Sequence, residues 1–210
     1  HNLFNKDDLV VIPDGGDYQG KTIEVAEKNL LWIRFHVQGK QAHGSRPDEG
    51  ANACLAGYDL ALRVNNLEKV FNKRDELFEP PYSTFQPTKK ESNVPNINTI
   101  PGDDVFCMDC RILPCYKLEQ VKSEIDKLVA QVENQYGVKI EYECPQQVES
   151  PATSKDSDVV KLLSSGIKAV KNIESKTIGI GGGTVGSYLR NEGYQCAVWS
   201  TLDETAHQPD

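Results

Sequence analysis

The chain has 210 residues, with 23 Lys and Arg against 31 Asp and Glu and a formal net charge of −8. This acidic balance argues against a nucleic-acid partner, and no apolar run approaches the ~18 residues that a membrane span requires. Six cysteines are too dilute for a disulfide scaffold, so the composition predicts a cytoplasmic globular protein of one to two domains with reduced thiols.

The beginning of the chain predicts one short strand. Residues 9–12 form an unbroken apolar run, Leu-Val-Val-Ile, which Pro-Asp-Gly-Gly follows at 13–16. An apolar run without alternation is typical of a strand buried on both faces, and Pro-Asp-Gly-Gly predicts that the strand ends in a turn. Asp14 therefore lies where α/β proteins place ligand-binding carboxylates, although Asp is also a common turn residue.

The middle of the chain predicts six elements in the order βαββαβ. Alternating apolar residues mark the first strand, and apolar residues in steps of three and four from Leu118 to Val132 mark the second helix, which Gly137 should end. This order is that of the ferredoxin-like split βαβ fold, with both helices on one face of a four-stranded sheet. The strands are expected at 30–38, 83–91, 105–113 and 138–144, the helices at 51–64 and 118–132, and a charged, Pro-rich linker at 68–82.

The last third of the chain has the pattern of an α/β domain. A helix should begin after Asp156 or Ser157 and face inward through Val159, Ile167 and Val170. The elements expected after it are a strand at 176–180, a glycine run, a short helix to Asn191 that Gly193 ends, and a strand at 195–200.

These patterns predict a domain inserted into another. We expect residues 1–27 and 146–210 to be two pieces of one α/β domain, since both contain short buried strands and turn glycines. Residues 28–145 should form the inserted α+β domain.

Two histidines and one cysteine pair are the first candidates for chemistry. His43 lies in a polar, Gly-flanked loop, and His207 follows a strand; for each, a solvated histidine is the plain alternative. Cys107 and Cys110 lie three positions apart on a predicted strand, where their side chains point to opposite faces and cannot bind one ion.

The strand that carries this cysteine pair also carries a possible anion binder. Asp109 and Arg111 share one face of the strand because they are two positions apart. Arg111 could form a forked pair with a substrate carboxylate, and an ordinary Asp109–Arg111 surface pair is the alternative.

The glycine run raises a rival interpretation. Gly181, Gly183 and Gly186 have the spacing of a dinucleotide fingerprint between a strand and a helix, and Asp203 follows about twenty residues on. The helix that follows is short, however, and the fingerprint is expected within a larger series of βα units.

Five short stretches, in a fixed order across nearly the whole chain, carry a more specific pattern. They are Ile12-Pro13-Asp14-Gly15; residues 37–47 with 50–53; Asn98-Thr99-Ile100-Pro101-Gly102 with Asp109-Cys110-Arg111; Gly182-Gly183-Thr184; and residues 206–210. Together these stretches resemble the acetylornithine deacetylase / succinyl-diaminopimelate desuccinylase family of co-catalytic zinc aminoacylases and exopeptidases. In that family, the inserted βαββαβ unit is a lid and dimerisation domain.

The resemblance implies two divalent metals, zinc in that family. Asp14 matches the strand-end carboxylate that ligates one metal, and His207 matches the histidine that ligates the other. The family's His-x-Asp segment, bridging Asp and Glu-Glu pair, which includes the general base, have no match in this chain. We therefore expect a truncated piece of a larger enzyme, inactive by itself and with incomplete metal binding.

The resemblance also implies a substrate, an N-acyl amino acid (of the deacetylase or desuccinylase type) or a small peptide with a free carboxylate. His43 matches the lid histidine that reaches the partner subunit's site and stabilises the oxyanion, and Asn98 and Arg111 match residues that hold the substrate's polar groups. The residues whose backbone matches the loop lining the substrate pocket are Gly182, Gly183 and Thr184.

A homodimer through the lid domain is the expected assembly. In the family, the first lid helix and an adjacent edge strand form an isologous contact, which here corresponds to residues 51–64 and 30–38. Two other function classes remain open: a non-catalytic dimerisation module, and a dinucleotide-binding fragment.

Overall fold

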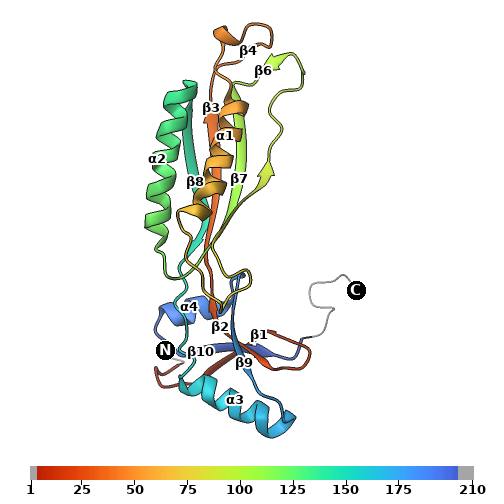
Figure 1. The fold of residues 1–210 in the computed structure, drawn as a ribbon, viewed down its shortest axis with the longest axis vertical. Helices are drawn as coiled ribbons and strands as arrows, with labels where there is room; N and C mark the ends of the chain where they lie inside the picture. The colour runs from red at the N-terminus through yellow and green to blue at the C-terminus, as the bar shows by residue number, and fades with distance from the viewer. Residues whose placement is uncertain (1–3, 203–210) are drawn as a thin grey trace. The chain divides into compact units, whose positions relative to one another are not determined.

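The computed structural model describes residues 4–202, and these divide into two compact units. Within the described residues, unit 1 comprises 4–29, 74–81 and 148–202, and unit 2 comprises 30–73 and 82–147 (Figure 1). Unit 2 is thus an insertion into unit 1. The described helices include none that is long and apolar enough to cross a membrane.

Unit 2 is a four-stranded sheet with two helices on one face (Figure 1). The strand order is β5-β7-β3-β8, so β3 and β7 are central and β5 and β8 form the edges. The predicted ferredoxin-like βαββαβ order is confirmed. The elements are β3 (Asn29–Gln38), α1 (Ala53–Asn65), β5 (Thr84–Lys90), β7 (Asp103–Ile112), α2 (Leu118–Tyr136) and β8 (Lys139–Val148).

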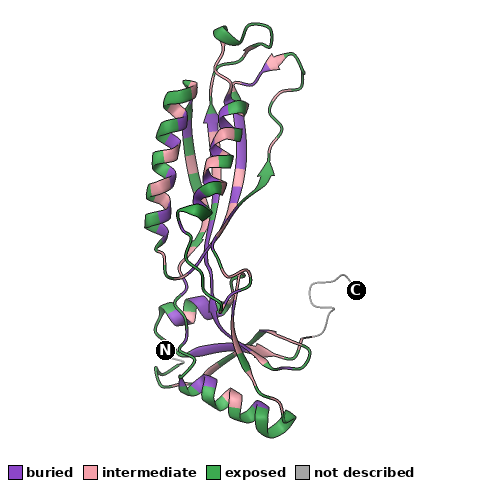
Figure 2. Ribbon diagram, viewed as in Figure 1, coloured by how far each residue is buried: buried purple, intermediate pink, exposed green. Residues whose placement is uncertain are grey.

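Alternating burial along β3 explains how this sheet carries a core on one face only. Ile33 and Phe35 are buried in the core that the helices cover, whereas Trp32 on the opposite face is 41 % exposed. Figure 2 shows buried residues along the central strands of this sheet. Both helices have sequence-encoded ends. Asn52 caps α1 by accepting a hydrogen bond from Leu55 N–H at 3.0 Å, and Gly137 ends α2 in the left-handed conformation at φ 64°.

A small two-stranded sheet extends one end of unit 2 (Figure 1). β4 (Ala42–His43) and β6 (Thr99–Ile100) pair antiparallel in segments that the sequence indicated only as loops. The loop is closely packed, because a Cβ at Gly39 would lie 2.1 Å from the carbonyl oxygen of Ala51. Short 3₁₀ turns, η1 (Pro47–Glu49) and η2 (Asn66–Lys69), flank α1.

Unit 1 contains a mixed four-stranded sheet in the order β1-β10-β2-β9. β1 pairs parallel with β10 and β2 pairs parallel with β9, while β10 and β2 are antiparallel. The C-terminal strands and helices lie where the sequence predicts them. The elements are β1 (Val10–Gly16), β2 (Thr22–Glu27), α3 (Asp158–Lys171), β9 (Lys176–Ile180), α4 (Val185–Asn191) and β10 (Cys196–Ser200).

Residues 74–81 belong to unit 1, although the sequence assigned them to the inserted domain as a linker. Gly179 N–H donates to Leu77 O at 2.7 Å, and Phe78 forms a parallel bridge with Gly179. The absence of a side chain at Gly179 is required here, because a Cβ would lie 2.4 Å from the Phe78 ring. The segment is therefore packed into unit 1.

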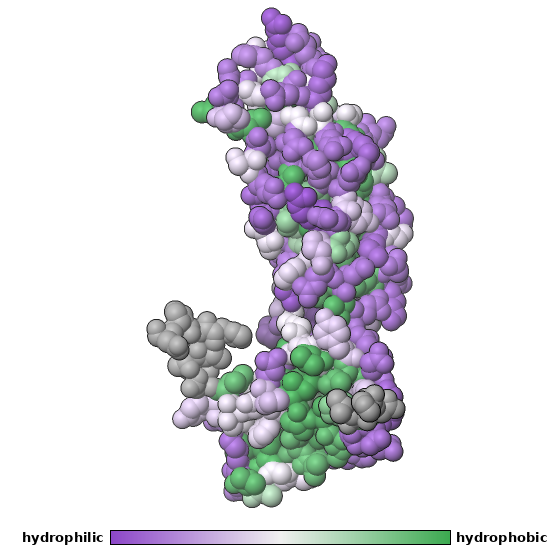
Figure 3. All heavy atoms as spheres, turned by 180° about the vertical axis from the view of Figure 1, so that it is seen from behind, coloured by the Kyte–Doolittle hydropathy of each residue, from purple (hydrophilic) through white to green (hydrophobic). Residues whose placement is uncertain are grey.

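Two sequence expectations in unit 1 are wrong. β1 is an edge strand on which Val11 is 41 % exposed, so it is not buried on both faces, and it continues through the predicted turn to Gly16. On α3, Val159 and Ile167 are buried as predicted, but Val170 is 84 % exposed and lies outside the core cluster that the other two join. Apolar side chains also gather on one face of unit 1 (Figure 3).

Candidate functional site

The β4–β6 pairing brings His43 and Asn98 together although 55 positions separate them in the chain. His43 lies opposite Thr99, and Gly44 N–H donates to Asn98 O at 2.6 Å. The His43 ring Nε2 then lies 3.5 Å from Asn98 Nδ2. Both side chains are exposed. Two polar groups that can bind an oxygen atom therefore face the same space at one end of unit 2.

Ser45 holds the other nitrogen of the same ring. His43 Nδ1 lies 2.8 Å from Ser45 Oγ and accepts a hydrogen bond from Ser45 N–H at 3.2 Å. Arg46 N–H donates to His43 O at 2.9 Å and closes the turn that carries Ser45. Sequence reasoning did not identify Ser45 as a functional residue, because Ser in a polar loop has no distinctive pattern.

Arg111 is not part of this cluster. It forms a forked ion pair with Asp109 on the same face of β7, with Nε–Oδ1 at 2.6 Å and Nη2–Oδ2 at 2.8 Å. Arg111 lies near the end of β7, whereas Asp103 begins the strand beside the β4–β6 sheet. Eight residues of strand span roughly 26 Å, so His43 and Arg111 of one chain cannot contact one small substrate.

Asp14 is exposed on β1, and its charge acts on the buried carboxyl of Glu24, a residue that sequence reasoning missed. Glu24 on β2 is only 6 % exposed and packs against Gly15, where a Cβ would lie 2.3 Å from Glu24 Oε1. Gly16 N–H donates to the Glu24 carboxyl. Burial, followed by the charges of Glu27 and Asp14, raises the pKa of Glu24 to about 7. The one sequence signal for this buried carboxyl was the position of an acidic residue between two apolar ones, Ile23 and Val25.

The glycine loop is held by a second buried acid. Thr184 N–H and Thr184 Oγ1 both donate to Glu27, at 3.0 and 2.6 Å, and Glu27 forms a buried ion pair with Arg190. Thr184 also caps the seven-residue α4 by accepting from Gly186 N–H at 3.0 Å. The Glu27 carboxylate therefore occupies the Thr184 donors at the start of α4, where a dinucleotide phosphate would bind, and this argues against the dinucleotide interpretation.

Gly182 and Gly183 of the same loop are exposed. They present backbone to the surface, as a substrate-lining loop requires, whereas the polar groups of Thr184 are engaged with Glu27. Of the three loop residues that the resemblance assigned to the substrate pocket, the two glycines thus have accessible backbone.

No complete metal centre exists among residues 4–202, which contain no group of three or more His, Cys, Asp or Glu arranged to hold an ion. Asp14 offers one exposed carboxylate, and the predicted ligand His207 lies outside the described residues. Cys110 is in the core and Cys107 is only partly buried, and burial raises the pKa of the Cys110 thiol. The described residues thus fit at most part of a metal site.

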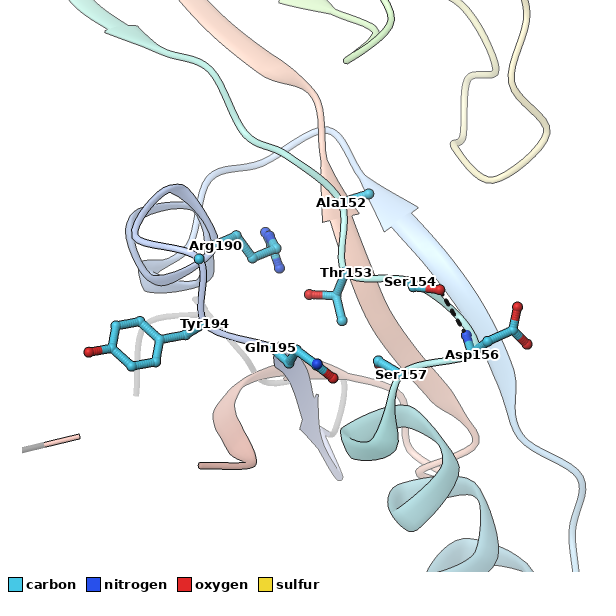
Figure 4. Close-up of a pocket in the computed structure, with 9 residues that line it drawn as sticks. Ala152, Thr153, Ser154, Asp156, Ser157, Arg190, Tyr194 and Gln195 are labelled. Carbon is cyan, nitrogen blue, oxygen red and sulfur yellow. Dashed lines mark hydrogen bonds between the residues drawn. The ribbon is translucent and has the colours of Figure 1, made fainter. Parts of the chain in front are cut away.

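A pocket of about 330 Å³ opens between α3 and α4 in unit 1. Arg190 reaches into its wall from α4 toward Thr153, and Ser157 lies at the start of α3 (Figure 4). Arg190 Nε and Ser157 Oγ have no hydrogen-bond partner, but both atoms are shielded from solvent, so a molecule in the pocket would not reach them. The pocket brings together no nucleophile and base, and we assign it no catalytic role.

Comparison with known proteins identifies the family. Residues 25–137 match the peptidase dimerisation domain of the M20 type, which is more than half of the chain. The chain belongs to the M20 peptidase dimerisation-domain family. The matched residues include all of β3, α1, β5, β7 and α2, and also His43, Asn98 and Arg111.

Relatives extend the similarity beyond the M20 dimerisation domain. A Methanocaldococcus jannaschii protein named "uncharacterized metallohydrolase" is 41 % identical over 99 % of this chain and 53 % of its own length. Succinyl-diaminopimelate desuccinylase of Wolinella succinogenes is 24 % identical over 96 % of this chain and 53 % of its own length. The chain spans about half the length of the curated relatives it matches.

Solved structures confirm the fold of this M20-type chain. A tripeptidase from Staphylococcus aureus has a TM-score of 0.73 at 20 % identity and covers 92 % of this chain and 49 % of its own. Aminopeptidase PepT from Bacillus cereus also has a TM-score of 0.73, at 17 % identity, over 93 % of this chain. The predicted arrangement, an α+β domain inserted into an α/β domain, is thus a fold that this chain shares with these structures.

Proposed function

We propose that the protein to which this chain belongs is a metal-dependent amidohydrolase that cleaves an N-acyl amino acid or a small peptide beside a free carboxylate. The names of its relatives, metallohydrolase and desuccinylase, support the reaction class. The observation that carries the proposal is the pair of His43 and Asn98, which the β4–β6 sheet brings to 3.5 Å. An imidazole and an amide at this spacing are suited to bind the oxygen that becomes negative when an amide is attacked.

The substrate contacts follow from the chemistry of the remaining residues. Arg111 has the planar guanidinium that binds a carboxylate through two hydrogen bonds, and a substrate carboxylate would compete with Asp109 for it. The exposed backbone of Gly182 and Gly183 can line a substrate site. Thr184 would hold this loop through Glu27 rather than contact substrate through its hydroxyl.

Two divalent metals, zinc in our proposal, would polarise the amide carbonyl and supply hydroxide when bound. Asp14 is the proposed carboxylate ligand for one, and His207, outside the described residues, for the other. The remaining ligands and the general base would come from parts of the longer protein that this chain does not include.

The dimer that we propose uses the groove between α1 and β5, with a second copy of the chain as the occupant. The groove has a volume of about 400 Å³ and an apolar lining that includes Tyr58, Leu62, Pro87 and Phe106. Leu62 is 63 % exposed and Tyr58 53 %, on a domain whose family is named for dimerisation. The sequence placed this contact on residues 30–38, which is wrong because β3 is a central strand; the edge strand beside α1 is β5.

A substrate series tests the proposed reaction. Full-length protein with zinc should hydrolyse N-acetyl or N-succinyl amino acids, and replacing the substrate's carboxylate by a carboxamide should raise KM. Arg111→Lys keeps the positive charge but loses the planar fork, so it should raise KM for the carboxylate substrate and reduce the difference between the two substrates. Equal KM values for both substrates with the wild-type enzyme would exclude Arg111 as the carboxylate binder.

A second candidate function, a dimerisation module without catalysis, is favoured for the 210-residue chain taken alone. Its described residues include the matched dimerisation domain but at most part of a metal site. Purified chain with added zinc or cobalt should show no hydrolysis above buffer. Metal-dependent turnover by this chain would require a different active site.

A further inference from the structure

The hydrogen bonds around His43 define which ring nitrogen carries the proton. Ser45 N–H donates to Nδ1 at 3.2 Å, and a backbone N–H can only donate. Nδ1 must therefore present its lone pair to Ser45. Ser45 Oγ, at 2.8 Å from the same nitrogen, can donate to that lone pair as well. In the neutral ring, the proton is then on Nε2.

Nε2 faces the side of the ring on which an oxygen atom could bind. Asn98 is the neighbour on that side, at 3.5 Å, and its backbone is fixed by the 2.6 Å bond from Gly44 N–H to Asn98 O. The Asn98 atom nearest to Nε2 is the amide Nδ2, and a flip of this amide would turn its oxygen toward the ring, where it would accept from Nε2–H in the resting state. An incoming oxygen atom can take the place of this acceptor without any change in ring protonation.

We propose that Ser45 is a positioning residue, which orients His43 as a neutral imidazole with its proton on Nε2, ready to donate to the developing oxyanion. This inference rests on the proposed function of His43. No covalent bond forms or breaks at Ser45 or His43: the ring donates a hydrogen bond from Nε2 and keeps its proton. Ser45 acts from the far side of the ring and does not contact substrate.

The turn geometry explains how one small residue can do this. Arg46 N–H donates to His43 O at 2.9 Å, which closes a four-residue turn with Ser45 inside it. The closed turn directs Ser45 N–H back toward the His43 ring, so the backbone and hydroxyl of one residue meet the same nitrogen. Ser45 is exposed, so substitution there removes the hydroxyl without opening a core.

Nitrogen NMR of ¹⁵N-histidine-labelled chain tests the tautomer directly. The His43 signals are identified by their loss in His43→Gln. The wild-type neutral ring should carry its proton on Nε2. Ser45→Ala keeps the backbone N–H donor to Nδ1 but loses the hydroxyl, so the preference for Nε2–H should weaken and the Nδ1–H form should become detectable. Ser45→Thr, which keeps the hydroxyl, should return the wild-type spectrum. Ser92→Ala is the matched control, because Ser92 is an exposed loop serine of the same unit outside the proposed site.

Kinetics of the full-length enzyme provide a second measurement. Loss of one hydrogen bond to His43 should lower kcat about 3- to 10-fold in Ser45→Ala with little change in KM, and Ser45→Thr should restore kcat. Unchanged tautomer and kcat in Ser45→Ala, or failure of Ser45→Thr to restore them, would overturn the role of Ser45. If His43→Ala itself leaves kcat unchanged, the proposed function of His43 fails instead, so the two failures are distinguishable.

Discussion

His43 contributes to catalysis, in our proposal, only where negative charge develops on the carbonyl oxygen. A group that acts in this way lowers the barrier without tightening substrate binding. His43→Ala in the full-length enzyme should therefore lower kcat by about 10² to 10³ and leave KM nearly unchanged. Steady-state kinetics and metal analysis of the same preparation check this prediction. A loss of bound metal in this variant would instead make His43 a ligand or a structural residue.

Glu24 provides a pH prediction for unit 1 in the metal-free chain. Its pKa is about 7 in the folded state against 4.5 for the ordinary group, so the folded chain holds this proton more tightly than the unfolded chain. The free energy of unfolding should fall as pH rises from about 4.5 to 7, with the penalty fully present above pH 7. Glu24→Gln, which mimics the protonated carboxyl, should stabilise the chain at pH 8 by about 1–3 kcal/mol.

Denaturant unfolding in the presence of a chelator measures this effect. The wild-type chain and Glu24→Gln should have similar stability near pH 4.5 and diverge toward pH 8. Glu91→Gln is a suitable control, since Glu91 lies on unit 2 and is 39 % exposed in its side chain. Parallel pH curves for the wild type and Glu24→Gln would show that the buried carboxyl is not the group that titrates.

At the scale of elements, the edge position of β5 decides how two copies can meet. β3 has neighbours on both sides, so dimerisation cannot use its backbone, whereas β5 has only β7. Leu62→Asp should place a charge in the apolar groove of α1 and β5 and convert the dimer to a monomer. Light scattering at tens of micromolar checks the mass, and an unchanged circular dichroism spectrum shows that the helices persist.

A matched control separates this interface from general solubility effects. Val170→Asp makes the same apolar-to-acidic change at a position that is 84 % exposed on α3 of unit 1. It should leave the dimer intact. A wild-type monomer, or a Leu62→Asp variant that stays dimeric, would exclude the groove as the interface.

The elements that the sequence predicted are those whose signal is local. The 3- and 4-residue steps of α2 and the alternation in β3 depend only on which side chains face the core, so both elements were predictable. β2 was missed because it carries two acidic residues, Glu24 and Glu27, whose burial depends on partners far along the chain. β4 and β6 have two residues each and exist only through their mutual pairing.

In the candidate site too, the sequence predicted individual residues but not the contacts that depend on distant strand pairing. Sequence motifs identified His43 and Asn98 separately, but the register that brings them to 3.5 Å is a property of the β4–β6 pairing. The pairing of Arg111 with Asp109 followed from alternation on one strand, and the structure confirms it. Whether β1 lies at the edge or the centre of its sheet could not be predicted, because an apolar run alone does not reveal how many neighbours a strand has.

At the scale of the whole molecule, the length of unit 2 determines how an active site could be assembled. His43 and Arg111 lie near opposite ends of β7, roughly 26 Å apart along the strand, which exceeds the length of an N-acyl amino acid. If both residues contact one substrate, they must come from different chains. A two-fold dimer provides this arrangement, because each copy can give its His43 to the partner's substrate site.

Mixing two inactive full-length variants tests this arrangement. His43→Ala lacks the oxyanion donor and Asp14→Ala lacks a proposed metal ligand, so each homodimer should be inactive. A hybrid dimer contains one intact site, formed from the metal ligands of one chain and the histidine of the other. After subunit exchange at equal concentrations, half of the dimers are hybrids with one working site in two, so activity should recover to about one quarter of the wild-type level. Inactivity at every mixing ratio, with exchange demonstrated by mass spectrometry of tagged subunits, would place His43 in its own subunit's site or outside catalysis.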